Sequence, residues 1–123
     1  MKEILWVGLG GFVGANARYL LGGWIAARVG TAVPYGTFVI NISGSFILGL
    51  IMGVLEGHLL SPVVRLAMAI GFVGAYTTFS TFTYETIRLI ETGSTLFAVA
   101  NVFGSLAFGL VAAIGGLLSG RAL

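Results

Sequence analysis

Four long apolar runs constrain this chain more than any other feature of its sequence. They cover residues 4–27, 35–55, 63–90 and 95–119, and short polar or turn-forming segments separate them. A helix needs about 20 mostly apolar residues to cross a bilayer. Charged residues make up only 8% of the chain, whereas a soluble domain carries about 25%. We therefore predict an all-α membrane protein in which residues 1–123 form one domain of four transmembrane helices.

The composition also excludes several classes of function. The chain has no cysteine, which rules out disulfide scaffolds, thiolate metal sites and cysteine-based catalysis. Six basic and four acidic residues are too few for a nucleic-acid surface. Twenty glycines instead predict helices whose backbones approach closely. We predict neither an enzyme nor a nucleic-acid partner, and we expect His58 in an exposed loop.

The distribution of basic residues does not favour one orientation in the membrane. With four spans, Lys2, Arg65 and Arg121 lie on one side, and Arg28 and Arg88 lie on the other. An excess of basic residues normally marks the cytoplasmic side. A chain without this excess either inserts in both orientations, so that two inverted copies pair, or is a weakly biased protein with a single orientation.

Polar side chains inside the second and fourth spans carry much of the functional information, because each needs a partner or a watery path in lipid. Thr37, Asn41 and Ser45 recur every four residues and therefore share one face of a helix. Asn101 and Ser105 repeat that spacing in the fourth span. Such residues form either hydrogen bonds between helices or a column of donors for conduction or binding, and the spacing leaves both open.

The middle of the third span is expected to be a poor helix. It contains Gly71, Gly74 and five Ser or Thr residues between positions 71 and 83. Glycine costs about 1 kcal/mol relative to alanine in a helix, so we predict a break here. Irregular backbone is tolerated at that depth only when it is buried in protein or lines a polar cavity, and freed carbonyls suit a hard cation. The alternative is a glycine-rich helix that only packs tightly.

Two charged residues and two phenylalanines are the remaining candidates for functional residues. Arg18 in the first span either attracts anions at a pore mouth or extends its charge towards the interface. Glu85 either forms an interfacial ion pair with Arg88 or belongs to a vestibule. Phe79 and Phe82 share one helix face, and aromatic ring edges carry a partial positive charge that can touch an anion.

Three segments of the chain match the motifs of a known family, in the same order. They are Gly14-Ala15-Asn16-Ala17-Arg18-Tyr19, the run GTFVINISGSF from Gly36 to Phe46, and the run from Gly71 to Phe82 that ends in TTFSTF. With them the chain resembles the small fluoride channels called Fluc or CrcB, over essentially its whole length.

This resemblance implies an inverted, dual-topology homodimer of four-helix subunits, with the third helix broken mid-membrane. It implies two antiparallel pores per dimer. Fluoride would leave the cell through these pores passively, down its electrochemical gradient, and this export would relieve fluoride toxicity. It also implies a location in the inner membrane of a prokaryote, with fluoride, the second subunit and the lipid bilayer as partners.

The resemblance also assigns roles to residues of the fluoride pore. Asn41 would contact the ion, and Phe79 and Phe82 would turn their ring edges towards it. Ser80 and Thr81 match the hydroxyl residues beside these phenylalanines.

Further roles follow from the same motifs. The backbone carbonyls of Gly74 and Thr77 match a site at the dimer interface for a structural Na⁺ held by both subunits. Arg18 and Glu85 match charged residues at the pore mouth or vestibule, and Ser105 matches a serine of the pore. One departure concerns the fourth span, where family members often carry tyrosine at the position of Asn101, so the resemblance assigns that residue no role.

Two other functions remain open from the sequence. A small four-helix, dual-topology exporter of drugs or other cations shares the length, the span count and the weak charge bias. Its mechanism needs a membrane-embedded glutamate in the first span, where this chain has Arg18 and no acid beyond Glu3. A non-transporting accessory subunit would use its polar columns only as contacts between helices.

Overall fold

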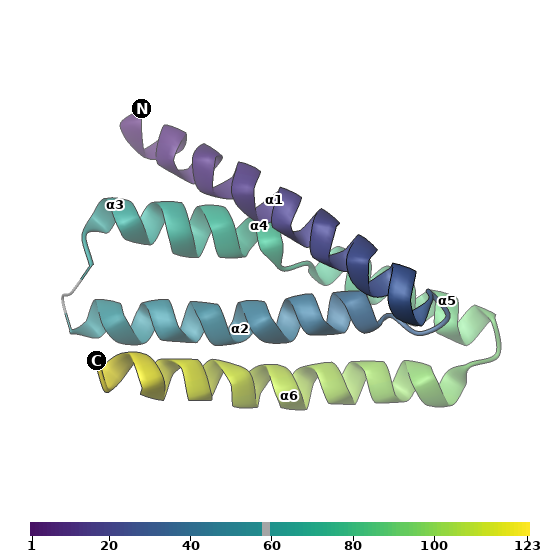
Figure 1. Ribbon diagram of the computed structural model, residues 1–123. Helices are drawn as coiled ribbons and strands as arrows, with labels where there is room; N and C mark the ends of the chain where they lie inside the picture. The colour runs from purple at the N-terminus through teal and green to yellow at the C-terminus, as the bar shows by residue number, and fades with distance from the viewer. Residues whose placement is uncertain (58–59) are drawn as a thin grey trace.

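The computed structural model describes residues 1–57 and 60–123, and all regular structure in these residues is helical. The helices are α1 (Lys2–Val29), α2 (Tyr35–Glu56), α3 (Pro62–Arg65), the π-helical η1 (Leu66–Val73), α4 (Gly74–Tyr76), α5 (Phe79–Glu91) and α6 (Thr95–Arg121) (Figure 1). Elements α3 to α5 together form the third span. His58, which we predict in an exposed loop, lies outside the described residues.

Within the described residues, four helical segments are long and apolar enough to cross a membrane. They are Lys2–Val29, Tyr35–Glu56, Pro62–Glu91 and Thr95–Arg121, and each overlaps one of the four apolar runs. The predicted all-α class with four transmembrane helices is confirmed.

Local sequence signals explain where several helices begin and end. Ser61 caps α3, because its Oγ accepts a hydrogen bond from the Val64 N–H at 3.4 Å. Pro62 occupies the first helical position, where the missing N–H is not needed. Gly30 after α1 has a φ of 80°, and Gly93 after α5 has a φ of 81°. Both angles lie in the left-handed region that favours glycine, so glycine allows the chain to turn back at these two points.

Helices α2 and α6 lie side by side and form the most extensive contact between two helices (Figure 1). Four glycines lie in this contact, two on each helix: Gly49, Gly53, Gly116 and Gly120. A Cβ at any of them would collide with backbone atoms of the opposite helix, such as the Phe46 carbonyl oxygen that faces Gly116. Glycine therefore lets the two backbones approach as closely as membrane helix pairs often do.

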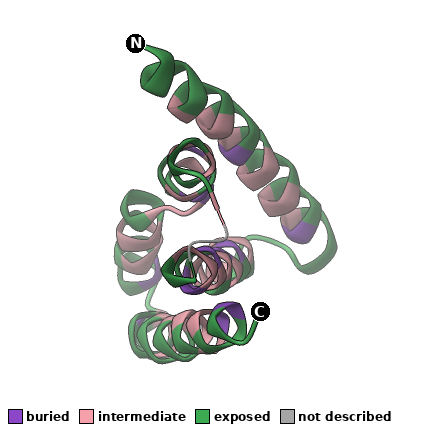
Figure 2. Ribbon diagram, turned by 90° about the vertical axis from the view of Figure 1, so that its left-hand side faces the viewer, coloured by how far each residue is buried: buried purple, intermediate pink, exposed green. Residues whose placement is uncertain are grey.

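Helix α1 crosses the third span at an angle and contacts it mainly at η1 (Figure 1). Gly10 faces the Ala67 carbonyl, and Gly14 faces the Phe72 carbonyl. Figure 2 shows that the outer side of α1 is largely exposed. Its apolar outer surface is therefore available to lipid or to another subunit.

We predict that Gly116→Ala lowers the free energy of unfolding by about 1–3 kcal/mol, the usual cost of overpacking. The added Cβ would overlap the Phe46 carbonyl oxygen. The measurement is a denaturant titration of the purified protein in detergent. Gly104→Ala on the same helix is the matched control, because no heavy atom lies within 4 Å of a Cβ built there. If both variants were equally stable, α2 and α6 would not approach as described.

Candidate functional site

Two threonines in extended conformation separate α4 from α5, and we call them the Thr77–Thr78 segment. Thr77 has a φ of −81° and a ψ of 157°, and Thr78 has a φ of −149° and a ψ of 118°. Thr78 also caps α5, because its Oγ1 accepts a hydrogen bond from the Thr81 N–H at 3.2 Å. A hydroxyl residue at this position satisfies an N–H that has no partner within the helix. The segment is the centre of the candidate site.

Asn41 of α2 binds the backbone of Thr78 through two hydrogen bonds. Its Oδ1 accepts a hydrogen bond from the Thr78 N–H at 2.8 Å, and its Nδ2 donates one to the Thr78 carbonyl oxygen at 3.0 Å. The side-chain amide thus pairs with Thr78 much as a neighbouring β-strand would. Because an amide nitrogen carries two N–H donors, one N–H of Asn41 is left over.

This pairing and the Thr78 cap each remove one carbonyl group from the helical hydrogen-bond pattern. In a continuous helix the Thr78 N–H would donate to the Gly74 carbonyl, but here it donates to Asn41 Oδ1. The Thr81 N–H would likewise donate to the Thr77 carbonyl, but it donates to Thr78 Oγ1. Gly74 is exposed, and nothing lies within 4 Å of a Cβ built on it. The carbonyl oxygens of Gly74 and Thr77 are therefore chemically suited to a hard cation.

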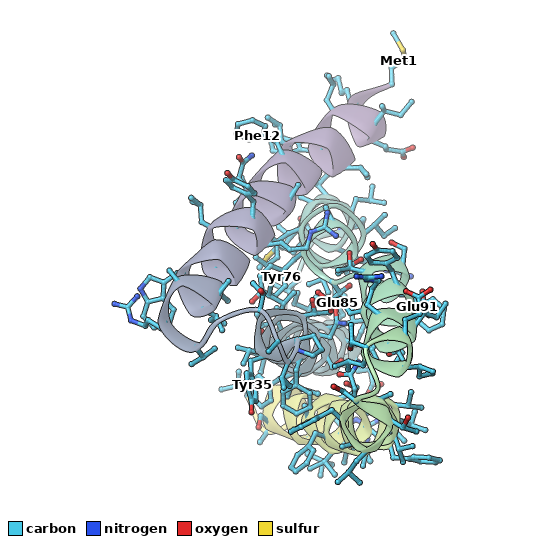
Figure 3. All side chains as sticks on the ribbon, turned by 90° about the vertical axis from the view of Figure 1, so that its right-hand side faces the viewer. Met1, Phe12, Tyr35, Tyr76, Glu85 and Glu91 are labelled. Carbon is cyan, nitrogen blue, oxygen red and sulfur yellow. The ribbon has the colours of Figure 1, made fainter. Side chains whose placement is uncertain are left out.

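Two more residues of α2, Ser43 and Gly44, contact the chain around the Thr77–Thr78 segment. Tyr76 is only 5% exposed, and its hydroxyl lies 2.8 Å from Ser43 Oγ. Figure 3 shows Tyr76 in the interior, between the helices. Gly44 is so close to the segment that a Cβ there would overlap Cγ2 of Thr77. The surface of α2 is therefore complementary to the segment as well as bonded to it.

Phe79 and Phe82 lie together immediately after the segment. Their ring centroids are 5.9 Å apart, and the ring planes are inclined at 42°. Phe79 is 77% exposed, and Ser80 and Thr81 beside it are exposed as well. A cavity of about 240 Å³ has both Asn41 and Phe79 in its lining. The structure thus brings together the amide and one of the phenylalanines that the sequence singled out on different spans.

A second cavity, of about 300 Å³, has both Arg18 and Glu85 in its lining. Thr37 and Thr78 line it as well, and because Thr78 also lines the first cavity, the two are adjacent. Glu85 Oε1 accepts a hydrogen bond from Thr37 Oγ1 at 2.9 Å. Its Oε2 is buried and has no hydrogen-bond partner among the described residues. Figure 3 shows Glu85 directed towards the inside of the helix assembly.

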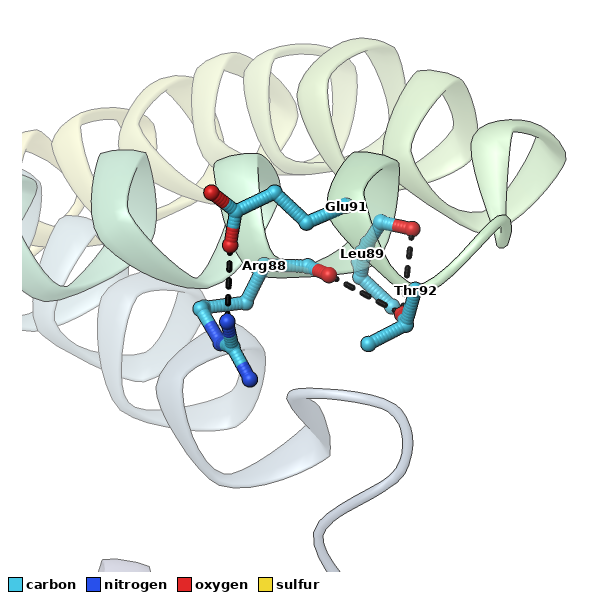
Figure 4. Close-up of polar contacts among 4 residues, drawn as sticks. All are labelled: Arg88, Leu89, Glu91 and Thr92. Carbon is cyan, nitrogen blue, oxygen red and sulfur yellow. Dashed lines mark hydrogen bonds and ion pairs between the residues drawn. The ribbon is translucent and has the colours of Figure 1, made fainter.

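Arg88 forms its ion pair with Glu91 and not with Glu85. Its Nη1 lies 2.7 Å from Glu91 Oε2, three residues further along α5 (Figure 4). Both side chains are 55% exposed, and exposed pairs of this kind contribute little to stability. The interpretation of Glu85 as the ion-pair partner of Arg88 is therefore wrong.

The polar residues of α6 lie apart from the Thr77–Thr78 segment. Asn101 Nδ2 donates a hydrogen bond to Thr86 Oγ1 of α5 at 3.0 Å. Ser105 Oγ approaches Asn101 Oδ1 at 3.5 Å, which is long for a hydrogen bond. Neither Asn101 nor Ser105 lines the two cavities described above.

Sequence reasoning assigned no role to Thr78 and Thr86, which form hydrogen bonds to α2 and α6 here. Thr78 had a usable signal, because a threonine just before a new helical run is a typical N-cap. Thr86 had none, because its partner Asn101 lies fifteen positions away on another helix.

The chain is similar to bacterial proteins over nearly its whole length. It is 52% identical over 120 residues to the fluoride-specific ion channel FluC of Acidobacterium capsulatum, which covers 97% of this chain and 96% of the relative. It is 48% identical over 112 residues to FluC of Geotalea daltonii, with 90% of each chain covered. It is 46% identical over 124 residues to FluC of Geotalea uraniireducens, with both chains covered completely.

Residues 5–117 match the family described as CrcB-like protein, Camphor Resistance (CrcB). This match includes all three segments from which the sequence predicted the family. The chain therefore belongs to the CrcB family.

Proposed function

We propose that the protein is a fluoride-selective ion channel and not an enzyme. It allows fluoride to leave the cell passively, down its electrochemical gradient. The observation that carries this proposal is the 52% identity, over 97% of the chain, to a relative named as a fluoride-specific ion channel. The four apolar helices suit a multi-pass protein of the prokaryotic inner membrane.

The side chains near the start of α5 support an anion path. Fluoride is small and strongly hydrated, so a dry path has to replace water with hydrogen-bond donors. Asn41 has one N–H left after its two bonds to the backbone, and the hydroxyls of Ser80 and Thr81 lie on exposed residues. The rings of Phe79 and Phe82 can add edges of partial positive charge.

Three further residues belong to the proposed path. Arg18 lines the larger cavity, and a cationic side chain at a concave mouth raises the local concentration of anions. Glu85 lies in the same cavity with one oxygen bonded to Thr37, which makes it a vestibule residue. Ser105 makes only a 3.5 Å contact, so its hydroxyl can still donate to an ion.

We also propose that the Thr77–Thr78 segment breaks the third span at mid-membrane. The segment lies close to the middle of Pro62–Glu91. Carbonyl oxygens of unwound membrane helices are common Na⁺ ligands, and those of Gly74 and Thr77 lack their helical partners. One structural Na⁺ bound by these oxygens from two subunits would supply a fixed positive charge beside the anion path.

An inverted homodimer would account for the exposed polar surface around the Thr77–Thr78 segment of the third span. Polar groups are unfavourable in hydrocarbon unless another protein surface covers them. Gly74, Ser80 and Thr81 are exposed in the single chain, and a second copy would cover them. Balanced basic residues permit both orientations, and inverted pairing would give two antiparallel pores per dimer.

The two alternative functions are separable from the channel. An exporter of cationic drugs needs a glutamate deep in the first span, and Glu3 in the first turn is the only acid in α1. An accessory subunit would transport nothing by itself.

We predict that liposomes containing only this protein release trapped fluoride, as recorded with a fluoride-selective electrode, and retain chloride. Asn41→Ala should slow the release by about tenfold, because loss of a partly buried hydrogen-bonding group costs about 1–3 kcal/mol. Unchanged release would remove Asn41 from the path. Fluoride retention by the wild-type protein would favour the accessory subunit, and release of organic cations instead would favour the exporter.

We predict that a C-terminal tag is accessible from both sides of the membrane in one population of cells. About half of the copies should react with an impermeant reagent in intact spheroplasts and the rest only in inverted vesicles, since the basic residues give no orientation preference. Labelling from a single side would rule out the inverted dimer.

We predict that Na⁺ raises the unfolding temperature of the purified dimer above its value in K⁺ or choline at equal ionic strength. An ion that binds only the folded state at 100 times its Kd adds about 2.7 kcal/mol of stability. The effect should saturate with Na⁺ concentration. Identical unfolding temperatures in the three salts would contradict the proposed Na⁺ site.

A further inference from the structure

A two-step hydrogen-bonded connection joins α6 to the backbone of Phe82. Asn101 Nδ2 donates to Thr86 Oγ1 at 3.0 Å, and Thr86 Oγ1 donates to the Phe82 carbonyl oxygen at 2.8 Å. Both Asn101 and Thr86 are half-buried. The Thr86 hydroxyl donates its single hydrogen to Phe82 and accepts a hydrogen from Asn101. Both partners therefore fix the position of this hydroxyl.

The preceding residue attaches α5 to a different helix. Glu85 Oε1 accepts a hydrogen bond from Thr37 of α2 at 2.9 Å. Successive residues of a helix point about 100° apart, so Glu85 and Thr86 hold α5 from two directions. Apolar burial adds little here, because Leu89 is the one buried side chain of α5. The rotation of α5 about its own axis therefore depends strongly on these two bonds.

Asn101 is poorly placed to contact an ion itself. It lines a mostly apolar cavity together with Tyr35, Phe38 and Phe97, and it is not among the lining residues of the cavities that contain Asn41 and Arg18. Its amide already donates to Thr86.

We propose that Asn101 is a positioning residue, which acts through Thr86 to fix the rotation of α5 and thus the direction of the Phe79 and Phe82 ring edges. The inference rests on the proposed fluoride channel, in which these edges meet the ion. It gives Asn101 a role in transport that requires no contact with fluoride.

The test uses the full-length protein with Asn101→Leu, Thr86→Val and the double substitution. Each single variant should slow fluoride efflux from liposomes by about fivefold, since one hydrogen bond contributes about 1 kcal/mol. The double variant should be no slower than either single variant, because both remove the same connection. Thr86→Ser keeps the hydroxyl and should retain the wild-type rate.

Direct contact between Asn101 and the ion would give a different pattern. Thr86→Val would then leave efflux unchanged, or the double variant would be slower by the product of the two single effects. Either result would overturn the positioning role.

Thr92→Val is the matched control, at the residue that directly follows α5. Thr92 Oγ1 donates to the Arg88 carbonyl at 2.9 Å, and its hydrogen bonds stay within its own helix and turn (Figure 4). The substitution removes the same kind of local bond as Thr86→Val without removing a contact to α6. Its efflux should equal that of the wild-type protein, and a loss as large as that of Thr86→Val would overturn the inference.

A spectroscopic readout separates this inference from the proposed function. A 4-fluorophenylalanine probe at position 82 should change its ¹⁹F chemical shift in Asn101→Leu and Thr86→Val, and should keep the wild-type shift in Thr86→Ser. The same probe at Phe12, which is 72% exposed on α1, should not change. An unchanged signal at position 82 would overturn the positioning role, whereas a wild-type protein that retains fluoride would overturn the channel.

Discussion

The pairing of the Asn41 amide with the backbone of Thr78 is the interaction on which the rest of the site depends. It satisfies an N–H and a carbonyl that would otherwise lack partners inside the membrane, where each unsatisfied group costs several kcal/mol. Because the Thr78 N–H is bound in this way, the Gly74 carbonyl loses its helical partner. Because Thr78 is extended, its hydroxyl can cap α5. One side chain of α2 thus contributes to where α5 begins and to which carbonyl oxygens before it lack helical partners.

Helix α2 can hold the third span because its other face is packed firmly against α6. Gly49 and Gly53 bring the backbones of α2 and α6 together, and Asn41, Ser43 and Gly44 contact the residues around the Thr77–Thr78 segment. The pair of α2 and α6 thus serves as a fixed support. Helix α5, which buries little apolar surface of its own, takes its orientation from polar bonds to both members of that pair.

The sequence could predict the spans and the weak helix near Gly74, but it could not choose between hydrogen-bond partners. Glu85 and Glu91 are each three residues from Arg88, and side chains at that spacing can meet on a helix. The structure pairs Arg88 with Glu91, since Glu85 is bonded to Thr37, which lies 48 positions earlier. No local pattern contains that information.

The sequence by itself determined the all-α class and the four spans, because a bilayer imposes a length and an apolar composition on consecutive residues. Its three motif segments determined the family. Only the tertiary structure decided that the Asn41 amide binds the Thr78 backbone and that Asn101 bonds to Thr86. A hydrogen bond requires its donor and acceptor to lie about 3 Å apart. Between residues on different helices, that distance is set by how the helices pack and not by the order of residues along the chain.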